Sequence, residues 1–219
     1  MDGNRRWAKA QGKASPDGHK AGVLALRKLI KASIERGIDF LTVYAFSSEN
    51  WKRSKTELDF LFTLLKESAQ KELNNLKDQG VRVKFIGDLS VFKNTKMGEA
   101  LEQLELETEM NTKLNLNVAL NYGSFAELKH SAEAILNDLD LDQIINLNED
   151  VFSQYLYTSE SPQIDLVIRT GGKQRLSNFM LWQASQAQLY FTDMYWPDFN
   201  EEIFDQALST SGLKEVCIR

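Results

Sequence analysis

The sequence predicts a single α/β domain in which a mainly parallel central sheet is covered by helices on both faces. Two observations support this prediction. Segments with helical spacing alternate along the chain with short runs rich in β-branched and aromatic residues. These short runs are apolar throughout, rather than at every second position, which is typical of strands buried on both faces. The sequence contains no internal repeat and no linker-like stretch, so residues 1–219 are expected to form one domain.

The predicted elements follow one another in a regular order. Residues 1–13 are expected to form a loop, and the first helix covers 19–36 and stops at Gly37. The predicted strands are 40–46, 81–86, 114–121, 165–169 and 189–191. The later helices are expected at about 55–78, 96–112, 125–137 and 177–187. Repeated β-α-β units give parallel strands, and ligands bind such sheets at the carboxyl ends of the strands.

Composition excludes several classes of protein. The chain has one cysteine, Cys217, so we expect no disulfide framework and a reducing, cytoplasmic location. Two histidines and one cysteine are too few for the usual zinc sites. No apolar run approaches the roughly 18 residues of a membrane span. The net charge of −5 argues against a nucleic-acid partner.

Positive charge is concentrated near the start of the chain. Residues 1–36 contain nine basic and three acidic residues. Some of the basic residues fit a solvated helix face, namely Arg27, Lys28 and Lys31. Others follow glycine and asparagine in the expected loop, where a positive field suits a small, highly charged anion such as a diphosphate: Arg5, Arg6, Lys9 and Lys13.

Two polar stretches after predicted strands are candidate binding sites. In Arg169-Thr-Gly-Gly…Arg175-Leu-Ser177, the glycines could turn backbone N–H groups towards an anion that the arginines clamp. A type II turn with surface arginines explains this pattern equally well. The stretch Ser47–Arg53 fits either a ligand-binding loop or a helix-capping loop in which Trp51 packs.

Two residues near the start of the chain are less specific. Asp2 offers a carboxylate near basic residues that could bind phosphate, an arrangement typical of a Mg²⁺ site. The alternative is a frayed terminus without a function, which is common for the first residues of a chain. His19 fits either a helix cap or a hydrogen-bond donor to an anion.

Longer stretches resemble the signature motifs of the undecaprenyl diphosphate synthases, the cis-prenyltransferase family. The resemblance runs from residue 1 to about residue 208. The matching stretches are Met1-Asp-Gly-Asn-Arg-Arg-Trp-Ala8, Gly18-His-Lys-Ala-Gly22, Leu41–Arg53, Asn121-Tyr-Gly123, Asp165–Phe179, Leu181-Trp-Gln183, Leu189-Tyr-Phe191 and Trp196-Pro-Asp-Phe199.

The resemblance implies an enzyme that adds isopentenyl diphosphate to farnesyl diphosphate with Mg²⁺, giving a long polyprenyl diphosphate that serves as precursor of the cell-wall lipid carrier. Asp2 would bind Mg²⁺ and assist departure of the allylic diphosphate, and Asn50 would serve proton removal. The allylic diphosphate would be held by Gly3, Asn4, Arg5, Arg6 and His19, and the isopentenyl diphosphate by Arg169, Arg175 and Ser177. The allylic site and its mobile lid would be lined by Ser47, Ser48, Glu49, Trp51 and Arg53, with Trp7 and Leu176 as further substrate-binding candidates.

The resemblance also implies a homodimer, membrane contact through the lipid product, and an apolar tunnel. Leu58, Leu61, Phe62 and Leu65 would line that tunnel, although the same stripe fits an ordinary core.

Several positions depart from the family pattern. The family has a strand before Met-Asp-Gly-Asn that is missing before Met1, and the tail 209–219 is divergent. Ser15 replaces a common arginine, for which Lys13 could substitute. Gln188 replaces a glutamate that helps to bind Mg²⁺, and Lys173 replaces an acidic residue. Further departures are Ser54 in place of proline and Ser124-Phe125 in place of Gly-Arg.

Two functional hypotheses remain. The favoured one is an active Mg²⁺-dependent cis-prenyltransferase. The alternative is an impaired or inactive homologue, or a partner subunit, that binds diphosphates without turnover.

Overall fold

The computed structural model of the chain describes residues 1–209 and 215–219. Within them, six parallel strands form one sheet in the order β2-β3-β1-β6-β4-β5. The strands are β1 (Phe40–Ser47), β2 (Val81–Ile86), β3 (Leu114–Tyr122), β4 (Leu166–Arg169), β5 (Gln188–Phe191) and β6 (Glu215–Ile218). The prediction of a parallel α/β sheet is therefore confirmed.

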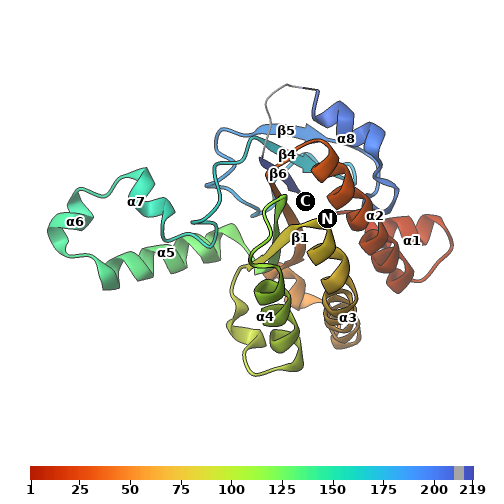
Figure 1. The fold of residues 1–219 in the computed structure, drawn as a ribbon, viewed down its shortest axis with the longest axis horizontal. Helices are drawn as coiled ribbons and strands as arrows, with labels where there is room; N and C mark the ends of the chain where they lie inside the picture. Colours follow the sequence, from red (N-terminus) through yellow and green to blue (C-terminus); the bar gives the residue numbers. More distant parts are fainter. Residues whose placement is uncertain (210–214) are drawn as a thin grey trace.

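The helices connect these strands and lie around the sheet (Figure 1). The α-helices are α1 (Asn4–Ala10), α2 (Ser15–Glu35), α3 (Lys55–Gln79), α4 (Lys96–Thr108), α5 (Ser124–Asp138), α6 (Leu141–Ile145), α7 (Glu149–Ser153) and α8 (Glu201–Ala207). Three short 3₁₀ helices are η1 (Ser48–Lys52), η2 (Leu89–Phe92) and η3 (Trp196–Asp198). Helices α5 to α7 form an arm that extends away from the body of the molecule.

Alternate residues of the strands point to opposite faces of the sheet, and each face has its own apolar cluster. Leu41 and Val43 of β1 face a large cluster to which α2, α3, α4 and α8 contribute. Tyr44 belongs to the cluster on the other face, where Phe179 stacks on it at a ring-centroid distance of 4.3 Å. Residues 176–187 thus help to cover the second face.

Two predicted elements are wrong. The expected helix at 177–187 does not form, since Ser177, Asn178 and Met180 have φ angles of 49°, 60° and 50°, which no α-helix contains. The apolar residues of this segment, among them Phe179, Met180 and Ala184, instead pack into the second apolar cluster without forming a helix. The expected loop over 1–13 contains α1, which begins after Gly3 at φ 113°.

Strand β6 was not predicted, because its residues fell in the divergent tail. It pairs with β1 on one side and β4 on the other, at the centre of the sheet. Residues 1–2 lie at its carboxyl end: the Thr170 hydroxyl donates to the carbonyl oxygen of Asp2 at 2.7 Å and to that of Arg219 at 3.4 Å. Asp2 therefore lies beside the carboxyl end of the central strand β6.

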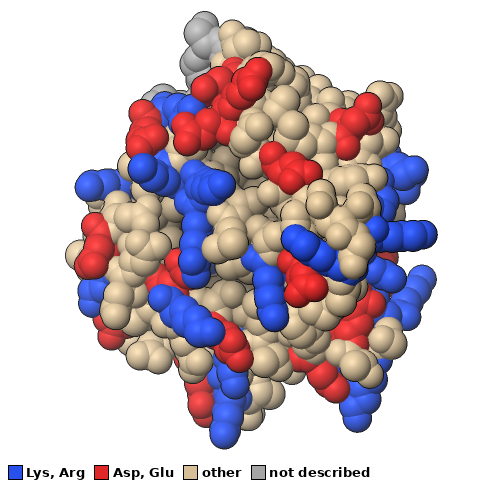
Figure 2. Space-filling model, turned by 90° about the vertical axis from the view of Figure 1, so that its right-hand side faces the viewer, with Lys and Arg blue, Asp and Glu red and all other residues tan. Residues whose placement is uncertain are grey.

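Surface charge on the face shown in Figure 2 is mixed, with lysine and arginine side chains interspersed among carboxylates. Among the helices of the described ranges, none combines the length and the apolar character that crossing a bilayer requires.

Candidate active site

Asp2 lies between two arginines at the carboxyl edge of the sheet. Its Oδ1 accepts a hydrogen bond from Arg6 and its Oδ2 accepts one from Arg169, each at 3.1 Å. Its carbonyl oxygen also accepts from the Trp196 amide at 3.1 Å. Contacts from the adjacent helix α1 and from two distant segments therefore hold Asp2 in place, and the frayed terminus considered for this residue does not occur.

The charges around Asp2 keep it ionised. Burial by itself would raise the pKa of the Asp2 carboxyl, but the hydrogen bond from Arg169 and the charges of Arg6 and Arg169 outweigh it, so the pKa is lowered. The side chain of Asp2 remains 31% exposed, while that of Arg169 is 3% exposed. The buried Arg169 thus holds the Asp2 carboxylate in place, and that carboxylate remains partly accessible to solvent.

Arg169, Arg175 and Ser177 come together, as one of the two interpretations of this motif requires. The Ser177 hydroxyl accepts hydrogen bonds from the Arg169 guanidinium at 2.8 Å and from Arg175 Nε at 3.0 Å. Arg169 also donates to the Arg175 carbonyl oxygen, and its buried Nε has no partner among the described residues. Arg175 is exposed, and half-buried Leu176 packs against the second cluster.

The two glycines of this motif do not present their N–H groups to a ligand, contrary to the expectation. The amides of Gly171 and Gly172 donate to the carbonyl oxygens of Met194 and Thr192. Both glycines have positive φ angles, and a Cβ on Gly171 would lie 2.5 Å from the Arg6 guanidinium. Gly171 therefore allows the close approach of Arg6, which donates to the Gly171 carbonyl oxygen at 2.6 Å, while a Cβ on Gly172 would lie 2.7 Å from Asp193 Oδ1.

Helix α1 packs closely on α2 through the glycines of the Gly18–Gly22 motif. A Cβ on Gly18 would lie 2.1 Å from the Asn4 carbonyl oxygen, and one on Gly22 would lie 2.4 Å from Asn4 Oδ1. Within the described ranges, Asn4 Oδ1 and His19 Nε2 are buried without hydrogen-bond partners. Two unsatisfied polar atoms thus face the same region, as expected of groups that await a polar ligand.

His19 is uncharged at neutral pH. Burial, and then the positive charge of Arg53, lower the pKa of its imidazole from 6.5 to about 4. The imidazole therefore acts as a hydrogen-bonding group rather than as a cation.

The stretch Ser47–Arg53 caps a helix and also contributes to the site. The Ser47 hydroxyl accepts from the Glu49 amide at 3.1 Å, and Asn50 Oδ1 accepts from the Ser47 amide at 3.3 Å, which together cap η1. The Trp51 indole donates to Asn121 Oδ1 at 2.7 Å. The Asn50 side chain, which takes part in this cap, also lines a cavity between the sheet and α2 and α3.

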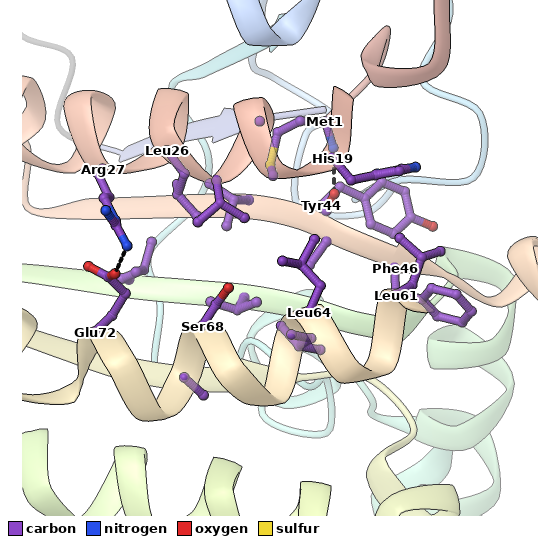
Figure 3. A pocket seen from close by; sticks show the side chains of 18 of the residues that line it. Met1, His19, Leu26, Arg27, Tyr44, Phe46, Leu61, Leu64, Ser68 and Glu72 are labelled. Atoms are coloured by element: carbon purple, nitrogen blue, oxygen red, sulfur yellow. Dashed lines mark hydrogen bonds and ion pairs between the residues drawn. The ribbon is translucent and has the colours of Figure 1, made fainter. Parts of the chain in front are cut away.

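A cavity of about 400 Å³ lies between the sheet and helices α2 and α3 (Figure 3). One end is polar and the middle is apolar. Of the predicted site residues, those that line it are Asp2, Asn4, His19, Ser47, Asn50 and Arg53. The expected tunnel is confirmed, with Leu61, Phe62 and Leu65 in its wall. Leu58 instead packs against the core outside the lining.

The other predicted site residues lie outside this lining. Asp2 links the cavity to Arg6 and Arg169, and Arg169 in turn contacts Arg175 and Ser177. Arg5 is exposed, and Gly3 ends the turn before α1. The Trp7 indole points elsewhere and donates to Asp198 at 2.7 Å. Glu49 accepts from Asn178 at 2.7 Å, and Ser48 packs beside Gly123.

Three residues of the site were missed by sequence reasoning. Glu57 pairs with Arg53 at 3.0 Å and with Arg5 at 3.7 Å, and its spacing of four from Arg53 was the available signal. Thr170 bridges Asp2 and Arg219. Arg219 lines the cavity with its guanidinium carbon 4.8 Å from the centroid of the Tyr44 ring, and no sequence motif marks it.

The departures from the family pattern fall in different places. Gln188 begins β5 opposite Leu166, whereas Arg169 pairs with Phe191 at the carboxyl end, so Gln188 lies roughly 10 Å along the sheet from the Asp2 edge. Lys173 is exposed beside the glycine turn. Ser54 replaces proline usefully, since its hydroxyl caps α3 by accepting from the Glu57 amide at 3.3 Å.

A parallel α/β fold with arginines, a carboxylate and a partly apolar cavity at its carboxyl edge fits the class of proteins whose ligands have an anionic head and an apolar tail. Residues 1–213 match the family model described as "Putative undecaprenyl diphosphate synthase". The chain belongs to this family.

Curated and solved relatives agree with this assignment. The chain is 45% identical over 213 residues to the ditrans,polycis-undecaprenyl-diphosphate synthase, (2E,6E)-farnesyl-diphosphate specific, of Buchnera aphidicola subsp. Schizaphis graminum, covering 95% of this chain and 84% of that protein. Lavandulyl diphosphate synthase from Lavandula x intermedia, solved with dimethylallyl diphosphate, is 32% identical with a TM-score of 0.89, covering 95% and 91% of the two chains. A probable undecaprenyl diphosphate synthase from Campylobacter jejuni is 34% identical with a TM-score of 0.77, covering 87% and 88%.

Proposed function

We propose that this protein condenses isopentenyl diphosphate with farnesyl diphosphate and repeats the addition to build a long cis-polyprenyl diphosphate. The observation that carries the proposal is the single cavity in which a charged end, with Asp2, Asn50 and Arg53, continues into an apolar middle. A prenyl diphosphate has the same division into an anionic head and an apolar tail.

The polar groups have separate tasks in this reaction. Arg6 and His19 would hold the allylic diphosphate, while Arg169, Arg175 and Ser177 would hold the isopentenyl diphosphate. The allylic C–O bond breaks with its electron pair leaving on the diphosphate, and the alkene of isopentenyl diphosphate forms the new C–C bond. The resulting carbocation would then lose a proton, beside Asn50, to the diphosphate that has just departed, and the Asn50 amide would orient the reacting group. Holding two reactants in register in this way contributes roughly 7–11 kcal/mol to such reactions.

Mg²⁺ fits the donor set of this site. In the described part of the chain no group of three His, Cys, Asp or Glu residues could hold a metal by itself. Mg²⁺ commonly takes one carboxylate together with substrate phosphates and water, and the ionised, partly exposed Asp2 supplies that carboxylate. When bound, the ion would neutralise charge on the departing diphosphate.

The test is turnover with farnesyl diphosphate, labelled isopentenyl diphosphate and Mg²⁺, for the parent and for Asp2→Asn. The matched control is Asp78→Asn, an exposed aspartate on α3. We expect long-chain product from the parent and the control and a loss of at least 100-fold for Asp2→Asn. No product from the parent would contradict the proposal, and equal product from all three would contradict the role of Asp2.

The alternative of an inactive, diphosphate-binding homologue rests on Gln188 and the divergent tail 209–219, together with Ser15 and Lys173. The position of Gln188 weakens this alternative. Gln188 lies at the start of β5, away from Asp2, so within one chain a glutamine in place of the family's glutamate does not alter the surroundings of Asp2. Binding of farnesyl diphosphate without turnover in the same assay would favour this alternative.

We also propose a cytoplasmic homodimer that meets the membrane only through its lipid product. Exposed apolar side chains on the arm support a second copy as partner, among them Phe125, Leu136, Leu141 and Ile145. Light scattering of the purified protein should give twice the chain mass of 25.0 kDa.

A further inference from the structure

The wall of the cavity that α3 provides changes its character along the helix. Leu61 and Leu65 line the part near the polar end, followed by Ser68 and then Glu72, at the three- and four-residue spacing of one helix face. Beyond Glu72 the same face presents Asn75 and Gln79. An apolar chain that grows along α3 therefore meets polar side chains from Ser68 onwards, interspersed with Ala69 and Leu76.

Glu72 forms an ion pair with Arg27 of α2 across the seam between the two helices (Figure 3). The side chain of Glu72 is only 13% exposed, whereas that of Arg27 is 44% exposed. The carboxylate thus faces the cavity, and the guanidinium reaches it from the outer side. A nearly buried carboxylate needs such a partner, because a charge left unpaired in an apolar surrounding is costly.

The seam that this pair spans is thin. A groove of about 200 Å³ lies on the outside of α2 and α3, with exposed Leu24 in its wall. The groove and the cavity share four lining residues: Val23, Arg27, Leu64 and Ser68. One layer of side chains therefore separates the interior of the cavity from this outer groove, and the ion pair lies within that layer.

The position of the pair can be compared with the length of a prenyl chain. Leu61 and Glu72 are separated by roughly 16 Å, at about 1.5 Å of rise per helical residue. An extended five-carbon unit is roughly 5 Å long, given C–C bonds of about 1.5 Å. About three units fill the stretch before the pair, so a longer chain must run past it, either further along the cavity towards Leu76 or outwards between α2 and α3.

We propose that the Arg27–Glu72 ion pair is a determinant of product length, because it closes the seam between α2 and α3 and confines the growing chain to the cavity. This inference rests on the proposed function. The pair touches the tail of the product rather than the reacting atoms, so it is a specificity-determining pair and not part of the catalytic machinery.

The test compares the product lengths of the parent with those of the double variant Arg27→Ala/Glu72→Ala, using farnesyl diphosphate and labelled isopentenyl diphosphate. The control is Lys77→Ala/Glu107→Ala, which removes an ion pair of 2.6 Å between α3 and α4 outside the cavity lining. We expect the seam variant to shift the main product by at least two five-carbon units towards longer chains. The control should keep the parent's distribution.

A charge-swapped variant, Arg27→Glu/Glu72→Arg, separates the ion pair from a mere change of volume. It restores the pair with the opposite polarity, and we expect it to return the product length to that of the parent. A swapped variant whose products stay long would overturn the role of the ion pair. An unchanged distribution in the alanine variant would overturn the inference outright.

If the double alanine variant fails to fold, Glu72→Ala alone gives the same readout, because Arg27 is exposed enough to be solvated without its partner. An unchanged distribution in that variant also overturns the inference. A parent protein that makes no product would contradict the proposed function instead, so the two failures are distinguishable.

Discussion

His19 should make the stability of this protein depend on pH. Burial and the charge of Arg53 lower its pKa from 6.5 to about 4 in the folded protein. Between these values the unfolded chain binds more protons than the folded one, so the free energy of unfolding rises with pH across this window and is level above it. Through His19, the free energy of unfolding at pH 4.5 should be about 2–3 kcal/mol lower than at pH 7.5, at about 1.36 kcal/mol for each unit of pKa difference.

The assay is urea-induced unfolding of the parent and of His19→Gln at several pH values from 4.5 to 7.5. Other groups titrate in this range, so the difference between the two proteins isolates His19. That difference should change by about 2–3 kcal/mol over the range, and His130→Gln, which alters an exposed histidine on α5, should not reproduce it. Parallel curves for the parent and His19→Gln would refute the reasoning.

Three further predictions follow from the contacts of the site and the core. Gly22→Ala should lower the free energy of unfolding by about 1–3 kcal/mol in urea titrations, because its Cβ would lie 2.4 Å from Asn4 Oδ1. Glu127→Gln should cost about 1–3 kcal/mol, since the carboxylate accepts hydrogen bonds from three donors and an amide nitrogen cannot accept them. Arg169→Lys should reduce kcat/KM roughly tenfold or more, and should move the acidic limb of the pH–rate profile upwards, because the pKa of Asp2 loses the hydrogen bond that lowers it.

The elements that sequence predicted well are those whose character is set locally. Strand β1 is a continuous run of β-branched and aromatic residues, and α3 is bounded by Ser54 and by Gly80 at φ 78°. Both signals act within a few residues, so no knowledge of the rest of the fold is needed.

The elements that sequence missed are set by distant partners. The apolar residues Phe179 and Met180 are buried against Tyr44 of β1, and this contact, rather than a helical period, explains their pattern. Gly171 of the arginine motif illustrates the same difficulty, because the close approach of Arg6 to this glycine depends on where α1 packs.

Strand β6 is the strongest case, and it bears directly on the site. The sheet order places β6 between β1 and β4, so the two halves of the sheet are joined through its hydrogen bonds. At about 4.8 Å per strand, β6 holds β1 and β4 roughly 10 Å apart. Asn50 and Arg53 follow β1, and the arginine motif follows β4, so this spacing sets the separation of these two polar stretches. Four residues without a strong strand signal of their own therefore fix the distance between the stretch Ser47–Arg53 and the arginine motif.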